Sequence, residues 1–254
     1  MTSDLKNTII NLQVQEDMLA IIFMGQAGVI LKDPQGKLYC IDVYFTDCCE
    51  REFGFKRLMP KLLAPSDLVF DYILTTHGHY DHFDVDAMPI LMNNDKTRLY
   101  TTKDGIGECE KLGITSRVLR INKGDTLTIG NIKLTAVFCD HGELAPDAVG
   151  FLIEAYGKKI YLVGDSCYRP DKIEYLRKEN INVMFVPING AFGNLNEMEA
   201  VCYVDRIKPE KAVPCHYGNF AEHGGSVEKY NEIFAQRITD TQNVNMKIGD
   251  MIFC

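Results

Sequence analysis

The chain has 254 residues, 46% of them hydrophobic and 24% charged, which suits a soluble protein with a large buried core. Its net charge of −8 argues against nucleic acid as the main partner, because phosphate backbones are bound by basic surfaces. Nine cysteines without a CxxC pair, the lack of a leader pattern and the lack of a long apolar stretch indicate a cytoplasmic protein without a membrane partner.

The first part of the chain predicts strands followed by a long irregular segment. Strands are expected at 19–23, 29–32 and 38–42, joined by turns that contain glycine. Residues 44–67 show only weak periodicity, with a short helix expected around 56–63. A loop of this length in a compact domain is more often functional than idle.

The middle of the chain predicts a short mixed section and then two hairpins. Asp84 is expected to cap a helix over 85–92, in which Pro89 is a complication. The other expected elements are a strand at 98–101, a helix at 106–112, a strand at 118–121, a hairpin at 126–139 and a hairpin formed by 149–155 and 159–163.

The last third alternates helices with strands. Asn196, with Glu199 three residues later, resembles a capping box, and Ser226 is a second helix cap. The expected elements are helices from Pro170 to about 178, from Asn196 to 207 and after Ser226, with strands at 183–188, at 211–215 and within 245–253. Hairpins followed by βα units predict an α/β protein with mixed sheets, helices on the outer faces and a single domain over residues 1–254.

The stretch from His77 to His82 concentrates metal-binding side chains. Three of the six histidines lie here, His77, His79 and His82, together with Asp81. Their spacing does not place them on one helix face but suits a loop that leaves a strand end. Imidazoles with a carboxylate suit zinc, or manganese and iron where oxygen ligands increase. A polar loop with histidines by chance is the weaker alternative at this density.

Three further candidates, His141, Asp165 and His216, each follow an expected strand. Ligands usually bind where strand ends meet at one edge of an α/β fold. A single histidine at a strand end is more often structural. Four strand ends that each supply a metal-competent side chain therefore indicate one shared site.

This pattern resembles the metallo-β-lactamase-fold hydrolases, whose signature is HxHxDH followed by His, Asp and His. The resemblance covers nearly the whole chain. It implies a four-layer αββα sandwich of two mixed sheets, with two divalent metal ions, zinc or manganese, at the edge of the sheets. By this resemblance, His77, His79 and His141 bind one metal, Asp81, His82 and His216 bind the other, and Asp165 bridges the two.

Within this superfamily, Gly164-Asp-Ser-Cys-Tyr168 and Cys215-His-Tyr-Gly-Asn-Phe220 are similar to the UlaG-like branch, the L-ascorbate-6-phosphate lactonases and their relatives. The resemblance implies a metal-dependent hydrolase in which a metal-bridging hydroxide attacks a lactone or a phosphorylated sugar-like ester. Asp81 and Asp165 are the expected catalytic residues, with Asp165 orienting the hydroxide and carrying its proton.

Substrate contacts are less defined by the sequence. Three cations, Lys56, Arg57 and Arg169, can bind a phosphate or carboxylate, although such residues are more often solvated surface charges. The candidates for hydrogen bonds to a sugar-like substrate are Tyr168, Asn189, Asn194 and Tyr217. His223 is an even choice between a pocket group and a surface histidine.

The expected partner is a small-molecule substrate, anionic if these cations are used, and a homo-oligomer is compatible with the sequence. A phosphodiesterase is the enzymatic alternative, because the same fold and metals serve that reaction. The net charge disfavours a tRNA-processing nuclease. A catalytically silent metal-binding regulator is a further alternative, which the intact set of ligands disfavours.

Overall fold

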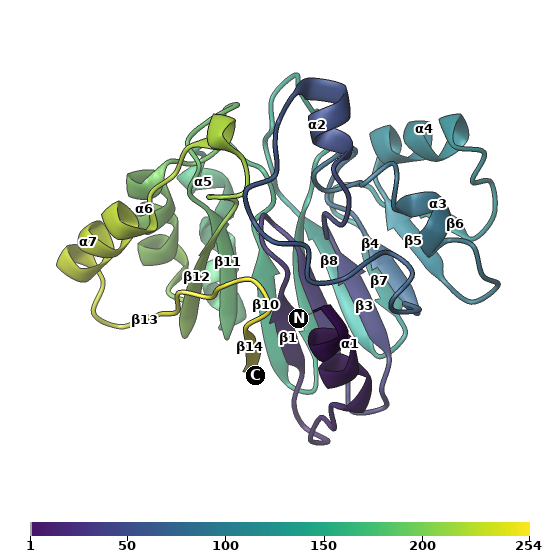
Figure 1. The fold of residues 1–254 in the computed structure, drawn as a ribbon. Coiled ribbons are helices and arrows are strands. Elements are labelled where there is room, and N and C mark those ends of the chain that lie inside the picture. The colour runs from purple at the N-terminus through teal and green to yellow at the C-terminus, as the bar shows by residue number, and fades with distance from the viewer. Residues whose placement is uncertain (1) are drawn as a thin grey trace.

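Two seven-stranded mixed sheets form the centre of the computed structural model, which describes residues 2–254 (Figure 1). The first sheet has the order β14-β1-β2-β3-β4-β5-β6, with β1 (Ala20–Phe23), β2 (Val29–Lys32), β3 (Leu38–Ile41), β4 (Tyr72–Leu74), β5 (Arg98–Thr101), β6 (Val118–Arg120) and β14 (Met251–Phe253). The second has the order β13-β12-β11-β10-β9-β8-β7, with β7 (Thr126–Ile129), β8 (Ile132–Val137), β9 (Gly150–Ala155), β10 (Lys158–Leu162), β11 (Val183–Pro187), β12 (Lys211–Cys215) and β13 (Gln242–Asn243).

Each sheet joins an antiparallel section to a parallel one. In the first sheet β3, β4, β5 and β6 run parallel, and in the second β10, β11, β12 and β13 do so. The carboxyl ends of parallel strands meet at the same edge of a sheet, which is where α/β proteins usually place their ligands.

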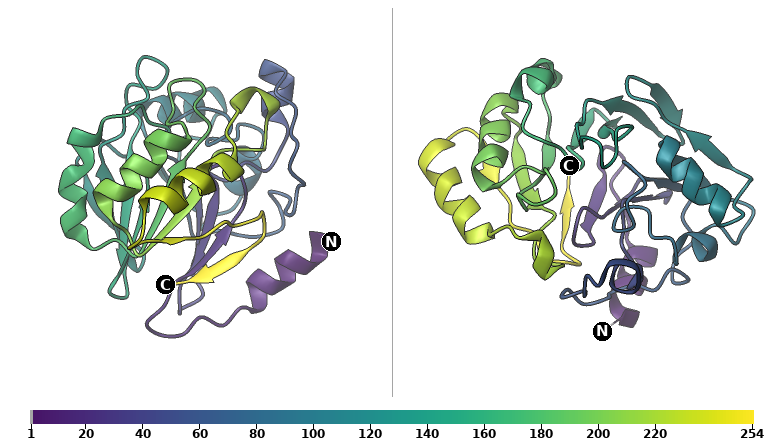
Figure 2. Two further views of the ribbon diagram at one scale, coloured as in Figure 1. Left: turned by 90° about the vertical axis from the view of Figure 1, so that its left-hand side faces the viewer. Right: turned by 90° about the horizontal axis from the view of Figure 1, so that it is seen from above.

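Helices cover the outer faces of both sheets (Figure 2). The helices on the side of the first sheet are α1 (Thr2–Asn11), α3 (Met88–Leu91) and α4 (Lys103–Lys111), and those on the side of the second are α5 (Pro170–Ile173), η1 (Glu174–Glu179), α6 (Glu197–Ile207) and α7 (Val227–Arg237). The short helices α2 (Cys48–Phe53) and η2 (Ala221–His223) lie in the connecting loops. This arrangement confirms the expected αββα architecture with two mixed sheets.

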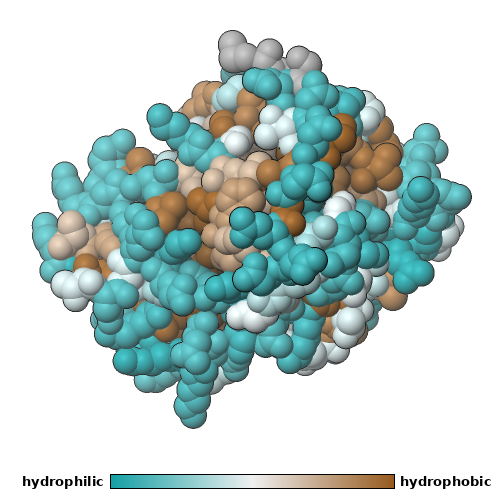
Figure 3. All heavy atoms as spheres, turned by 90° about the horizontal axis from the view of Figure 1, so that it is seen from below, coloured by the Kyte–Doolittle hydropathy of each residue, from teal (hydrophilic) through white to brown (hydrophobic). Residues whose placement is uncertain are grey.

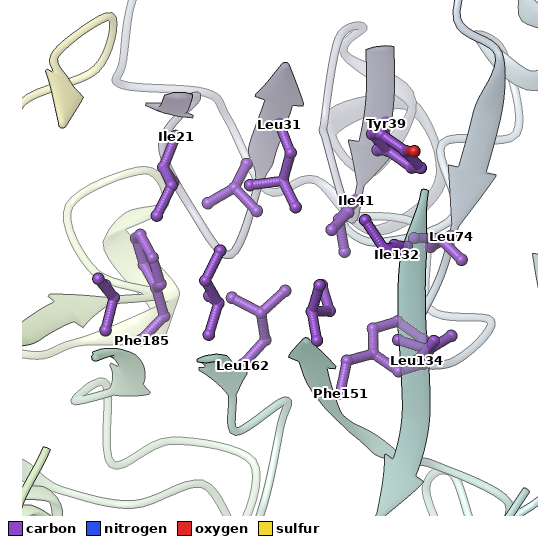
Figure 4. Close-up of a cluster of buried hydrophobic side chains, with 14 of the residues drawn as sticks. Ile21, Leu31, Tyr39, Ile41, Leu74, Ile132, Leu134, Phe151, Leu162 and Phe185 are labelled. Carbon is purple, nitrogen blue, oxygen red and sulfur yellow. The ribbon is translucent and has the colours of Figure 1, made fainter. Parts of the chain in front are cut away.

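The largest buried cluster lies between the two sheets (Figure 4). Ile21, Leu31 and Ile41 of the first sheet point toward Phe151 and Leu162 of the second, and all five are at least 95% buried. Burying each such side chain stabilises the fold by roughly 1.5–3 kcal/mol. Helices pack on the opposite face of each sheet, so the central strands are apolar on both faces and read as continuous hydrophobic runs.

The irregular segment 44–67 differs from its prediction. Its helix is Cys48–Phe53, which ends at Gly54 in the left-handed conformation with φ 77°. The helix expected around 56–63 is wrong, because Arg57 reaches back to carbonyl oxygens at the start of the segment and holds the chain as a folded loop.

The bounds of other elements also differ from those predicted. The helix expected over 85–92 is limited to Met88–Leu91, because Pro89 has no N–H and fits only the first turn. The helix expected from Pro170 continues beyond Ile173 as the 3₁₀ helix η1. Within 245–253 only Met251–Phe253 is a strand, and α1 was not expected. Two predicted helix caps are confirmed: Asn196 and Glu199 form a capping box, and the Ser226 hydroxyl accepts from the N–H of Lys229. The expected cap at Asp84 is wrong for α3, because the shortened helix has Ala87 at its N-cap position.

The surface at the end of the molecule away from α2 is mostly hydrophilic, with a band of hydrophobic side chains across it (Figure 3). Within residues 2–254, no helix is long and apolar enough to cross a lipid bilayer.

Candidate metal centre

Four of the predicted ligands lie on the loop that leaves β4. Asp42, which follows β3, accepts hydrogen bonds from the backbone N–H of Thr76 at 2.8 Å and from its hydroxyl at 2.5 Å, which fixes the start of this loop. The carbonyl of His79 then accepts from the N–H of His82 at 2.9 Å. The turn brings the side chains of this loop to the edge where the two sheets meet.

His77, His79 and His141 form a first cluster of nitrogen ligands. Nε2 of His77 lies 3.0 Å from Nδ1 of His79. The His141 ring lies edge-on to both, with centroid distances of 5.3 and 5.0 Å. Since His141 follows β8 in the second sheet, both sheets contribute to this cluster.

Asp81, His82 and His216 form a second cluster. Nε2 of His216 lies 3.2 Å from Nε2 of His82 and 3.3 Å from Oδ2 of Asp81. His216 directly follows β12, so its position at the end of this parallel strand places it opposite the β4 loop.

Asp165 stands between the two clusters. Its Oδ1 lies 3.1 Å from Nε2 of His216 and 3.4 Å from Nε2 of His82, whereas its Oδ2 lies 3.7 Å from Nε2 of His141. The amide of Asn194 donates to Oδ2 at 2.8 Å and fixes the carboxylate. One oxygen therefore faces each cluster.

These donor sets fit divalent cations. Ligands bound to one zinc ion at about 2.0–2.2 Å have their donor atoms roughly 3 Å apart, close to the separation of His77 from His79 and of His216 from His82 and Asp81. Oδ1 of Asp165 is also buried without a hydrogen-bond partner. Buried polar atoms normally have a partner, so this atom fits a centre that binds cations.

Charges in the second cluster are closely coupled. Burial favours the neutral acids, but His82 and His216 hold the pKa values of Asp81 and Asp165 well below the usual range. Burial also opposes protonation of His216, but Asp165 and Asp81 raise its pKa to about 9. A divalent cation can replace such protons, because it supplies the positive charge that the carboxylates need.

Three residues around the centre have left-handed backbone conformations, with φ of 53° at Gln26, 49° at Asp42 and 60° at His216. Such conformations are unfavourable for residues other than glycine and concentrate at functional sites. The N–H of His216 donates to the carbonyl of Gln26 at 2.7 Å, which ties two of these residues together.

The sequence interpretation did not include Gln26 or Asp42 among the site residues. Asp42 lies 2.9 Å from Nδ1 of His82, and the amide nitrogen of Gln26 lies 2.8 Å from Oδ2 of Asp81. Asp42 directly follows a strand, as the predicted ligands do, and this signal was available in the sequence. Gln26 carried a weaker signal, its place in a glycine-flanked turn.

A pocket of about 550 Å³ opens above the metal centre. Its floor contains His79, Asp81, His141, Asp165 and His216, and its walls include Phe53, Phe55, Leu144, Phe192 and His223. Among the described residues, no lysine or arginine lines it.

Most of the predicted substrate contacts lie outside this lining. Arg57 is occupied by backbone carbonyls and stacks on Tyr44 at 4.0 Å. Lys56 is exposed, and Arg169 pairs with Asp140 at 3.1 Å. The remaining candidates outside the lining are Tyr168 and Tyr217, which pack against the core under α6 and α7, and the buried Asn189. Of the set, Asn194 contacts Asp165, and His223 lines the pocket.

Comparison with known proteins places the chain among metal-dependent hydrolases. Residues 26–217 match the family model described as "Beta-lactamase superfamily domain". Over 188 residues the chain is 30% identical to a UPF0173 metal-dependent hydrolase of Natranaerobius thermophilus, covering 74% of this chain and 83% of that protein. The chain belongs to the UPF0173 family of the metallo-β-lactamase superfamily.

Another UPF0173 protein, from Pyrococcus furiosus, is 32% identical over 204 residues, covering 80% of this chain and 86% of that protein. Among solved structures, a metallo hydrolase from the archaeon Ignicoccus hospitalis is similar with a TM-score of 0.72 and 16% identity, covering 93% of this chain and 98% of that chain. The structural likeness shows the shared metallo-β-lactamase fold.

Proposed function

We propose that this UPF0173 hydrolase cleaves an uncharged carboxyl ester or lactone that carries an apolar or aromatic group. The observation that supports this proposal is the position of the metal centre at the floor of a pocket with apolar walls. Phe53, Leu144 and Phe192 line this pocket while remaining 55%, 57% and 47% exposed. Large apolar side chains that gather at the surface mark binding sites.

The lining disfavours a phosphorylated substrate. Asp104 and Glu108 are the acidic residues of the pocket wall. Asp104 accepts from the N–H of Gly78 at 2.8 Å, and Glu108 pairs with Lys111 at 2.7 Å. Both carboxylates are thus used within the protein, and the wall offers no cation to a phosphate. Of the two substrate classes that the UlaG-like resemblance implies, the pocket favours the uncharged lactone.

The ligand set would hold two divalent cations, zinc or manganese: His77, His79 and His141 for one, Asp81, His82 and His216 for the other, with Asp165 shared. When bound, such cations supply an activated water as nucleophile and polarise the attacked carbonyl. Asp165 contributes a fixed carboxylate between the two positions, because Asn194 holds one of its oxygens. In this arrangement Asp165 orients the water and accepts its proton.

The test is a substrate panel on protein loaded with zinc or manganese. The panel contains dihydrocoumarin as an uncharged aromatic lactone, 6-phosphoglucono-δ-lactone as a phosphorylated lactone and bis(4-nitrophenyl) phosphate as a phosphodiester. The proposal predicts the highest kcat/KM for dihydrocoumarin and loss of this activity in His141→Ala. A preference for the phosphorylated lactone or for the phosphodiester would contradict it.

A further inference from the structure

Gln26 and His223 form a buried pair beside the metal centre, and neither belongs to the seven-ligand pattern. Gln26 lies in the turn between β1 and β2 and is 1% exposed, whereas His223 ends η2 and is 5% exposed. The fold brings these residues together from opposite ends of the chain. The amide of Gln26 contacts Asp81, and the ring of His223 stacks on His216.

The contact with Asp81 determines the orientation of the Gln26 amide. An ionised carboxylate only accepts hydrogen bonds, so the amide atom 2.8 Å from Oδ2 of Asp81 is the donor Nε2. The same Nε2 lies 2.9 Å from Nδ1 of His223. Nε2 of His216 lies slightly farther from it, at 3.1 Å. The two hydrogens therefore go to the two nearer acceptors, Asp81 and His223, while Oε1 of Gln26 is buried without a partner.

This hydrogen bond determines the tautomer of His223. Since Nδ1 accepts from Gln26, it carries no proton, and the proton of the neutral imidazole lies on Nε2. Among residues 2–254, no protein group accepts a hydrogen bond from this Nε2. The atom is not among the fully buried polar atoms that lack a partner. His223 lines the pocket, so this N–H is available to a molecule bound there.

Aromatic packing fixes the plane of the His223 ring. The ring stacks parallel to His216 with an interplanar angle of 3° and a centroid distance of 5.0 Å. Phe220 and Phe192 approach it edge-on at 4.9 and 5.4 Å, and Phe55 does so at 5.8 Å. A donor held in this way is oriented before the substrate arrives, which lowers the entropic cost of binding.

We propose that His223 donates a hydrogen bond from Nε2 to an oxygen of the substrate, and that Gln26 is the positioning residue that sets this tautomer. The inference rests on the proposed function, since it names a hydrogen-bond donor for the substrate beside the apolar side chains of the pocket wall. It explains how an ester without charged groups is oriented over the metals: the apolar walls hold its carbon skeleton and His223 holds one oxygen.

A role as a metal ligand is the competing explanation. The ligand atoms of Asp81, His216 and His223 lie within 4.8 Å of one another. A metal needs a free nitrogen lone pair, however, and His223 offers none while Nδ1 accepts from Gln26 and Nε2 carries the proton. The two roles are separated by measuring metal content.

The experiment compares His223→Phe, which keeps a ring without a donor, with His223→Gln, which restores an N–H. We expect both zinc-loaded variants to retain the metal content of the parent. His223→Phe should bind the product of dihydrocoumarin hydrolysis, 3-(2-hydroxyphenyl)propanoate, about 10- to 100-fold more weakly by calorimetry. His223→Gln should recover part of this affinity. Loss of zinc in His223→Phe, or unchanged product affinity, would overturn the assignment.

The role of Gln26 is tested by NMR of zinc-loaded protein labelled with ¹⁵N-histidine, which needs no turnover. We expect His223 to be protonated on Nε2 alone, and Gln26→Leu to lose this preference while its zinc is retained. A proton on Nδ1 of His223 in the parent protein would overturn the inference. Absence of dihydrocoumarin turnover in the parent would instead contradict the proposed function, so the two failures are distinguishable.

Discussion

Nδ1 of His82 lies 2.9 Å from Oδ2 of Asp42, and both side chains are at least 97% buried. The carboxylate thereby directs Nε2 of His82 toward His216, 3.2 Å away in the second cluster. Substitution of a residue that hydrogen-bonds to a metal-binding histidine typically lowers metal affinity 10- to 100-fold. We expect Asp42→Ala to weaken zinc binding by about 10- to 100-fold, measured by competition with a chelating dye.

Asp33 provides the matched control for this variant. It is 1% exposed but lies at the opposite end of β3, where it accepts from the hydroxyl of Tyr39 at 3.2 Å. Asp33→Ala should lower thermal stability and leave zinc affinity unchanged. Equal zinc affinity in Asp42→Ala and the parent would refute the role of Asp42.

Phe192 tests the apolar character of the pocket wall. It is 47% exposed, and its ring centroid lies 5.9 Å from that of Phe55, which also lines the pocket. Phe192→Ala removes apolar surface worth roughly 1.5–3 kcal/mol when buried against a substrate, so we expect KM for dihydrocoumarin to rise about tenfold or more with zinc content unchanged. Tyr175→Ala, at a residue that is 50% exposed on η1, is the control and should leave KM unchanged. An unchanged KM in Phe192→Ala would argue that the aromatic wall does not contact the substrate.

Metal binding should weaken as pH falls. The pKa of His216 in the metal-free protein is raised to about 9 because Asp165 and Asp81 outweigh the effect of burial. His216 therefore holds a proton at neutral pH that a cation must displace, and this competition increases at lower pH. We expect the apparent zinc affinity to decrease about tenfold per pH unit for each displaced proton between pH 8 and 6. Calorimetry in buffers of different ionisation enthalpy measures the released protons, and a pH-independent affinity would contradict the coupling.

Arg57 is expected to affect stability and not substrate charge recognition. Its side chain is 7% exposed, donates to the carbonyl of Tyr44 at 3.0 Å and stacks on that ring. Arg57→Met should lower the free energy of unfolding by about 1–3 kcal/mol, measured by urea denaturation. The exposed neighbour Lys56, substituted in the same way, should change stability little. A large effect of Arg57→Met on KM with unchanged stability would restore its predicted role in substrate binding.

Local patterns in the sequence predicted mixed sheets with outer helices and a shared site at the strand ends, whereas the αββα sandwich and the division of the ligands between two metals came from the family resemblance. Strands bounded by glycine turns are readable from local patterns, and His141, Asp165 and His216 each follow such a strand. Both β8 and β10 are antiparallel to β9, and β12 runs parallel to β10 through β11, so all three strands end at one edge of the sheet. These steps need only local information and one general rule of topology.

Contacts between distant residues were not readable in this way. The helix expected around 56–63 failed because Arg57 bonds to carbonyls more than ten residues away. The pair of Gln26 and His223 depends on a contact between the two ends of the chain and on a left-handed backbone at Gln26. Neither feature leaves a periodic signal in the sequence.

The most direct test of a two-metal ester hydrolase is a titration of metal-free protein with zinc or manganese while dihydrocoumarin hydrolysis is followed. If the seven ligands hold two cations that act together, turnover should rise and saturate at two equivalents of metal per chain. Saturation at one equivalent, or two bound metals without turnover of the lactone, would contradict the account.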